Sequence, residues 1–199
     1  YLIVLLGVFV GLIVAVFAID EVLKNATGDY VLLKQYQRNR LLVFLDPSAD
    51  VTGTGFNLNQ AMIAIGSGGL FGKGLLNGSQ SSLGFVPESA TDFIFCVLAE
   101  QFGFMGALVL LALYLALILV SIRIARESSD LFGTLIVMGI VGMWLFQILE
   151  NIGMDCGLMP ITGIPLPFVS YGSSFMVVNF ALIGLIGSVY SHTSTQSGF

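Results

Sequence analysis

Long apolar stretches constrain the fold of this sequence more than any other feature. A helix rises about 1.5 Å per residue, so about 20 apolar residues are needed to cross the hydrocarbon core of a bilayer. Four stretches reach or approach that length, and we predict four membrane-spanning helices at about residues 1–23, 92–120, 131–153 and 174–190. The second stretch is long enough to tilt or to extend beyond the bilayer.

The composition agrees with lipid as the main solvent of the chain. Only 10% of its 199 residues are charged and 56% are hydrophobic, and the mean hydropathy is +0.96. Average soluble domains carry about 25% charged residues. The net charge of −5 comes without a basic stripe interleaved with aromatic residues, which argues against nucleic-acid binding. We therefore predict an all-α integral membrane protein with no nucleic-acid partner.

Charge placement predicts the orientation of the spans. Arg123 and Arg126 lie in the short link between the second and third spans, and the positive-inside rule assigns such a link to the cytoplasm. The alternation of spans then puts two loops outside, a long loop at 24–91 and a proline-rich loop at 154–173. The long loop contains several basic residues, but long loops are exempt from the rule.

The long outer loop contains a predicted amphipathic helix and a glycine-rich segment. Leu58, Ala61, Met62 and Ile65 recur at the i, i+3, i+4, i+7 spacing of one helix face. We expect this helix to lie at the membrane interface or to dip into it. Six glycines at 66–78 allow a tight bend and a close approach to a ligand. The segment lacks the GxxxxGK[ST] pattern, so we exclude a nucleotide-binding P-loop.

The candidate catalytic residue is Asp92, at the predicted outer end of the second span. Ionisable residues are costly inside a membrane, so their positions are informative. Asp92 has two interpretations. It or Thr91 could cap the helix, because both side chains accept hydrogen bonds from backbone N–H groups. Alternatively, partial desolvation could give the Asp92 carboxylate a pKa suited to a general base.

Other polar residues near the same end are candidates for substrate binding. They are Glu88, Glu100, Gln147 and Asn151. Gln147, Glu150 and Asn151 are spaced i, i+3, i+4, so they share one helix face that we expect to turn toward protein or water rather than lipid. Glu88, in the outer loop, can also be read as a solvated acid.

Basic residues of the outer loop could hold a diphosphate, since guanidinium groups bind phosphate oxygens bidentately. They are Lys34, Arg38, Arg40 and Lys73. The alternative is that these residues only solvate the loop.

The sequence shows no cluster of metal ligands. The single histidine, His192, lies near the C-terminus, and Cys96 and Cys156 have no CxxC partner. We therefore predict no metal site in the protein and interpret the two cysteines as small apolar fillers rather than a disulfide.

Three long motifs carry a resemblance to a known family. They read QYQRNRLLVFLDPSADVTGTGFNLNQAMIAIGSGGLFGKG, VPESATDFIF and NIGMDCGLMPITGIPLPFVSYGSS. Together they resemble the SEDS family of shape, elongation, division and sporulation proteins, and LLKQYQRNRLLVFLDP and FGKG are more similar to its elongation members than to its division members. The family fold is a bundle of ten membrane helices, so the resemblance implies that this chain is the last four with the catalytic outer loop. Because the chain begins at Tyr1 inside an apolar run, we expect it to continue a longer protein.

The resemblance also implies a function. Members of this family are peptidoglycan glycosyltransferases of the bacterial cytoplasmic (inner) membrane, which polymerise lipid II outside it together with a class B penicillin-binding transpeptidase. The family's essential aspartate, in its TDF motif, matches Asp92. Lys73, Arg38 and Arg40 would face the substrate diphosphate, which would carry any divalent cation (Mg²⁺ or Mn²⁺). A flippase for lipid-linked precursors and a membrane scaffold for the transpeptidase are the alternatives.

Overall fold

The computed structural model of the protein is all-helical in the part of the chain that it describes. That part consists of residues 53–75, 77–78 and 91–196, with the single positions Gly11, Val16, Ile19, Asp20, Arg40 and Val43. Its helices are α3 (Thr54–Gly68), α5 (Ile94–Glu127), α6 (Leu131–Asp155) and α7 (Ser173–Gln196).

Three of these helices are long and apolar enough to cross a membrane. The qualifying stretches are Ile94–Glu127, Leu131–Asp155 and Ser173–Thr193. They correspond to the second, third and fourth predicted spans. The first predicted span, 1–23, lies almost entirely outside the described residues, so the count of four spans stays a prediction.

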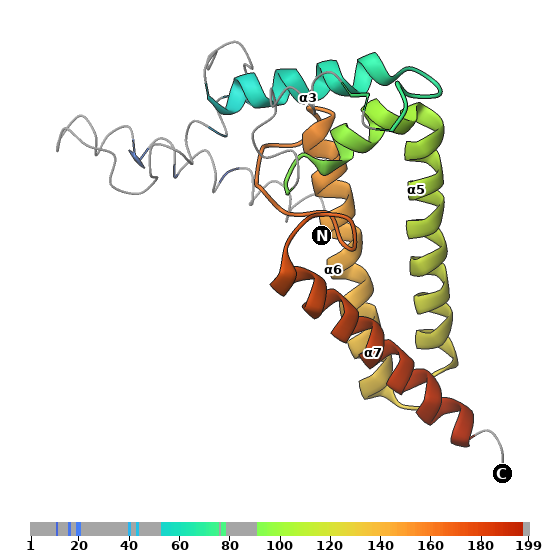
Figure 1. The fold of residues 1–199 in the computed structure, drawn as a ribbon. Coiled ribbons are helices and arrows are strands. Elements are labelled where there is room, and N and C mark those ends of the chain that lie inside the picture. The colour runs from blue at the N-terminus through green and yellow to red at the C-terminus, as the bar shows by residue number, and fades with distance from the viewer. Residues whose placement is uncertain are drawn as a thin grey trace.

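Helix α5 is broken near its start. Gly103 has φ 68° and ψ −163°, a conformation that glycine adopts without a steric penalty. Figure 1 shows the short first part of α5 lying across the top of the bundle beneath α3, while the long second part descends beside α6. The long straight part of α5 therefore begins after Gly103, about ten residues later than the predicted start of the span at Asp92.

The glycine-rich segment after α3 forms backbone hydrogen bonds with α5 on both sides of this break. The four bonds run from Lys73 N to Glu100 O and from Gly74 N to Gln101 O, both 3.0 Å, from Phe104 N to Gly69 O at 2.9 Å, and from Met105 N to Leu70 O at 3.1 Å. A Cβ at Gly72 would lie 2.1 Å from the Gln101 oxygen, and one at Gly103 would lie 2.3 Å from the Gly72 nitrogen. The glycines thus allow a close approach to α5, which satisfies backbone groups that lipid could not hydrogen-bond.

Helix α3 packs its predicted apolar face inward. The four residues predicted for that face are Leu58, Ala61, Met62 and Ile65, and all four are buried or half-buried. They pack in one apolar cluster with Phe93, Cys96 and Met154, from the start of α5 and the end of α6. The chain thus forms a helix at the predicted place with the predicted face inward, and Figure 1 shows it lying across the top of the bundle. Its position at the membrane interface stays a prediction.

The loop between α6 and α7 folds back into the bundle. The Tyr114 hydroxyl, well along the straight part of α5, donates to the Pro167 carbonyl at 2.5 Å. Phe168 packs edge-on against Trp144 with ring centroids 5.3 Å apart, and the Trp144 Nε1–H group donates to Asn179 Oδ1 at 2.7 Å. Non-helical backbone at this depth is tolerated where protein buries it. The middle of the predicted outer loop 154–173 therefore lies among the helices.

Candidate active site

Asp92 lies in the turn that leads into α5. The N-cap residue of that helix is Phe93, whose side chain cannot accept a hydrogen bond. Neither Thr91 nor Asp92 therefore occupies the cap position that one of the two interpretations assigned to them. The turn is held instead by side chains from α6 and from the loop before α7.

Two side chains hold the main chain on either side of Asp92. Asn151 donates through Nδ2 to the Asp92 carbonyl at 2.7 Å and to the Ile164 carbonyl at 2.9 Å. The Ser170 hydroxyl donates to the Thr91 carbonyl at 2.6 Å. Asn151 and Ser170 are both fully buried, so water does not compete for these bonds. The backbone of Asp92 is therefore tied to α6 and to the 164–170 loop at once.

The Asp92 carboxylate lies against Gly163. A Cβ built on that glycine would be 2.9 Å from Oδ2 of Asp92 and 3.6 Å from Nη1 of Arg40. The same Nη1 donates to the Thr162 carbonyl at 2.7 Å. Two predicted site residues that lie far apart in the sequence, Asp92 and Arg40, thus meet over one short stretch of backbone.

Two more carboxylates surround this point, both from the end of α6. Glu150 is 4% exposed and Asp155 is fully buried, and the charge of Asp92 acts on both. Oδ2 of Asp155 accepts from the Cys96 backbone N–H at 3.1 Å. Among the described residues, neither carboxylate oxygen of Glu150 accepts a hydrogen bond of good geometry. The Thr162 hydroxyl nevertheless lies close enough to favour the charged form of Glu150. Like charges repel, so the carboxylates of Asp92, Glu150 and Asp155 disfavour one another's negative charge.

Lys73 and Glu100 form a separate pair beside the break in α5. The Lys73 Nζ atom lies 2.9 Å from Oε1 of Glu100, whose side chain is fully buried. Both were predicted to contact substrate. In this structure their opposite charges largely neutralise each other, so neither side chain presents its full charge to a ligand.

Three predicted site residues remain: Gln147 on α6, and Arg38 and Glu88 in the predicted outer loop. Gln147 lies half-buried on the face of α6 that carries Glu150 and Asn151, and the prediction that this face turns away from lipid is confirmed. Arg38 and Glu88 lie outside the described residues.

The sequence-based candidates did not include Gly163, Ser170 or Asp155. Gly163 and Ser170 belong to the motif ITGIPLPFVSYGSS, which pointed to the family but not to individual roles. Asp155 is the last residue of α6, close after Glu150, and this spacing of acids was the available signal.

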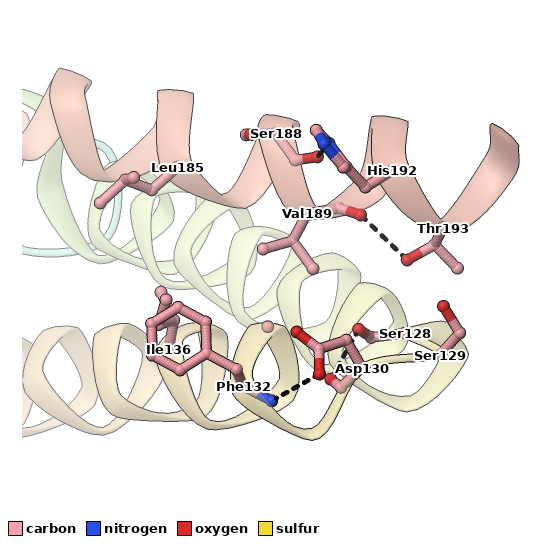
Figure 2. Close-up of a pocket in the computed structure, with 11 residues that line it drawn as sticks. Ser128, Ser129, Asp130, Phe132, Ile136, Leu185, Ser188, Val189, His192 and Thr193 are labelled. Carbon is pink, nitrogen blue, oxygen red and sulfur yellow. Dashed lines mark hydrogen bonds between the residues drawn. The ribbon is translucent and has the colours of Figure 1, made fainter. Parts of the chain in front are cut away.

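A cavity of about 460 Å³ lies elsewhere, between the start of α6 and the last turns of α7 (Figure 2). Figure 2 shows polar side chains of this cavity that form hydrogen bonds with the backbone of their own helices. Asp130 accepts from the Phe132 backbone N–H at 3.3 Å, and Thr193 donates to the Val189 carbonyl at 2.9 Å. None of the predicted site residues lines this cavity.

The fold and the site define a class of protein. Helices long enough to span a membrane meet, at one end, a buried polar site built from a turn, a helix end and a returning loop. The sequence profile of the FtsW/RodA/SpoVE family, described as cell cycle protein, matches residues 1–195, and the chain belongs to this family.

Curated relatives agree with this assignment. The chain is 45% identical over 168 residues to the peptidoglycan glycosyltransferase MrdB of Escherichia coli (strain K12), covering 84% of this chain and 45% of MrdB. It is 46% identical over 158 residues to the peptidoglycan glycosyltransferase RodA of Treponema pallidum (strain Nichols), covering 79% and 36%. It is 41% identical over 159 residues to the stage V sporulation protein E of Bacillus subtilis (strain 168), covering 80% and 43%. The chain thus spans less than half the length of these relatives.

A solved structure is also similar. It comes from a study titled "Structural coordination of polymerization and crosslinking by a peptidoglycan synthase complex". The match has a TM-score of 0.65 and 32% sequence identity, and it covers 92% of this chain and 49% of that chain.

Proposed function

We propose that this chain carries the catalytic site of a peptidoglycan glycosyltransferase that polymerises lipid II into glycan strands. One observation supports this most directly. Asp92 is fixed through its main chain by Asn151 and Ser170, while its carboxylate lies over Gly163 beside Arg40. A carboxylate on a firmly held backbone, next to a guanidinium, suits a reaction that removes a proton and releases a diphosphate.

In this proposal Asp92 is the general base. Its carboxylate takes the proton from a hydroxyl of the acceptor sugar, and the freed oxygen attacks the anomeric carbon of the donor. The bond from that carbon to the diphosphate oxygen breaks, and undecaprenyl diphosphate leaves with the bonding electron pair. A positioned base of this kind contributes about 10²–10⁴-fold to the rate.

We assign the diphosphate first to Arg40, with Arg38 and Lys73 as further candidates. Arg40 lies beside Asp92, where negative charge develops on the leaving group. Lys73 is paired with Glu100, so it would reach a diphosphate only by exchanging partners. Glu88 and Gln147 stay candidates for substrate binding, while Asn151 and Glu100 use their side chains within the protein.

A divalent cation would belong to the substrate in this proposal. Across the described residues, no group of three or more His, Cys, Asp or Glu side chains is arranged to hold a metal ion. Mg²⁺ is commonly bound through one or two carboxylates together with substrate phosphates.

We propose that the site faces the outside of the bacterial cytoplasmic membrane. Asp92 precedes α5 and Arg126 lies in the last turn of that helix, so the two lie at opposite ends of it. The positive-inside rule places the Arg126 end in the cytoplasm. On intact cells, an impermeant thiol reagent should label Cys156 and should not label a cysteine placed at Ser128. The reverse pattern would invert the orientation.

We further propose a role in cell elongation and shape, with a class B penicillin-binding transpeptidase as partner. Two relatives at 45–46% identity are named MrdB and RodA. The similar solved structure belongs to a complex that its title connects with both polymerization and crosslinking.

A lipid-linked precursor flippase is the alternative function. A transporter places ionisable groups near the membrane centre. Asp, Glu, Lys and Arg are absent from residues 104–122 of α5, 131–149 of α6 and 173–196 of α7. This favours chemistry at the membrane surface, and a scaffolding role for the transpeptidase is compatible with it.

The Asp92→Asn variant of the full-length protein tests the proposal. Asparagine keeps the size of the side chain but cannot act as a base, so glycan synthesis from lipid II should fall by at least about 10²-fold. The assay is run with the partner's transpeptidase blocked, and expression and partner binding should not change. Asp130→Asn, which alters the cap at the far end of α6, is the matched control because asparagine caps a helix as well as aspartate. Near-normal synthesis by Asp92→Asn would overturn the assignment.

A further inference from the structure

Gly163 lies in contact with the proposed base, and its own role follows from what a side chain there would meet. A Cβ would lie 2.9 Å from Oδ2 and 3.7 Å from Cγ of Asp92, and 3.6 Å from Nη1 of Arg40. The first distance is shorter than carbon and oxygen atoms tolerate without bonding. A side chain at Gly163 would therefore force something to move.

The backbone on both sides of this contact is held in place. Asn151 binds the carbonyls of both Asp92 and Ile164, and Arg40 binds the carbonyl of Thr162. Ser170 holds the carbonyl of Thr91. The group that can yield most easily is the Asp92 side chain, which rotates about a single bond.

We propose that Gly163 is a positioning residue, whose missing side chain leaves the space in which the Asp92 carboxylate lies beside Arg40. This inference rests on the proposed function of Asp92 as the base. A base acts only when it reaches the hydroxyl that it deprotonates, and a displacement of about 1 Å can lower the rate by about 10²-fold. The diphosphate is assigned to Arg40, whose bond to the Thr162 carbonyl does not involve this carboxylate, so we expect substrate binding to change less than the rate.

Gly163 also has a backbone conformation that favours glycine, and this effect differs from the crowding of Asp92. Its φ is +79°, which non-glycine residues rarely adopt, so an ordinary substitution would strain the backbone as well as crowd Asp92. Asparagine adopts positive φ more readily than most residues. Gly163→Asn therefore relieves most of the strain but keeps the Cβ that crowds the carboxylate.

Gly157 provides the matched control in the same loop. Its φ is +72°, and it follows the C-cap of α6, a position where asparagine sometimes takes the place of glycine. A Cβ there would meet only the flexible end of Met62, at 3.1 Å. Gly157→Asn thus tests positive φ without crowding the base.

The experiment compares Gly163→Asn, Gly163→Ala and Gly157→Asn in the full-length protein with lipid II. Both Gly163 variants should lose about 10²-fold in kcat with KM changed less than about threefold, and Gly157→Asn should keep the wild-type kcat. A wild-type kcat in Gly163→Asn would overturn the inference. So would a loss confined to Gly163→Ala, because that pattern reports strain alone.

A cryo-EM map of the Gly163→Asn protein gives a readout that does not depend on activity. We expect the Asp92 carboxylate to turn away from Arg40 in that map. If the wild-type protein makes no glycan, the proposed function fails, but the map still decides the inference. An Asp92 side chain in its original position would overturn it.

Discussion

The side-chain amide of Asn151 donates to the Asp92 backbone carbonyl at 2.7 Å and, with its second hydrogen, to the Ile164 carbonyl at 2.9 Å. One buried side chain of α6 thereby joins the turn before α5 to the loop before α7. Asn151 was predicted to bind substrate. Its two N–H groups fix the position of the Asp92 backbone relative to the backbone next to Gly163.

We expect Asn151→Ala to lower the free energy of unfolding and to reduce glycan synthesis. The substitution leaves the carbonyls of Asp92 and Ile164 without their donor, and each buried unpaired group costs about 1–3 kcal/mol. Thermal unfolding in detergent and the polymerisation assay measure the two effects. Gln147→Ala is the control for the unfolding measurement, since Oε1 of Gln147 has no hydrogen-bond partner among the described residues. Equal losses of unfolding free energy in the two variants would contradict the role of Asn151.

Lys73→Met should destabilise the protein by about 3 kcal/mol, because it leaves the buried Glu100 without its counter-charge. That figure is the lower end of the range for breaking a buried pair, since Lys73 is itself partly exposed. Adding Glu100→Gln should restore most of the stability. Denaturant or thermal unfolding of the single and double variants forms the cycle.

The same double variant separates structure from substrate binding. If Lys73 contributes only to this pair, Lys73→Met with Glu100→Gln should bind lipid II as the wild type does. Weak binding that persists after stability has recovered would return Lys73 to the diphosphate site.

Gly103→Ala should destabilise the protein more than an alanine in the middle of a helix would. Its φ of +68° is unfavourable for alanine by about 1–2 kcal/mol, and the new Cβ would lie 2.3 Å from the Gly72 nitrogen. Gly139→Ala is the control, because that glycine has open space around it in α6 and alanine favours helix by about 1 kcal/mol. Melting temperatures in detergent should fall for Gly103→Ala and hold or rise for Gly139→Ala. No difference between them would contradict the backbone contact at the break.

Cys156 should react with maleimide only at a pH higher than an ordinary exposed cysteine requires. Partial burial, and then the negative charge of Asp155, raise the pKa of the Cys156 thiol. A raised pKa means less of the reactive thiolate at any given pH, so the midpoint of the rate profile should lie above about 8.5. Cys96 and Cys156 are both free, as predicted, and Cys96 is buried, so Cys156→Ser should remove the labelling. A midpoint at or below the ordinary value would refute the prediction.

Local features of the sequence determined the elements of this fold. The length of the apolar runs predicted three helices that the structure describes, because crossing a bilayer requires a minimum number of apolar residues. The spacing of Leu58, Ala61, Met62 and Ile65 predicted which face of α3 is buried. The spacing of Gln147, Glu150 and Asn151 predicted an inward face on α6. Periodicity succeeds here because it is a property of a single helix.

Tertiary structure alone decided how those elements form the site. No pattern marked Gly103 as a break, because membrane helices tolerate glycine for close packing as well as for kinks. The contacts of Asp92 with Gly163 and Asn151, and the bond of Arg40 to the Thr162 carbonyl, join segments that are distant in the sequence, and helical spacing relates only residues a few positions apart. Which glycine leaves room for a carboxylate is decided only when the returning loop is packed against the turn before α5.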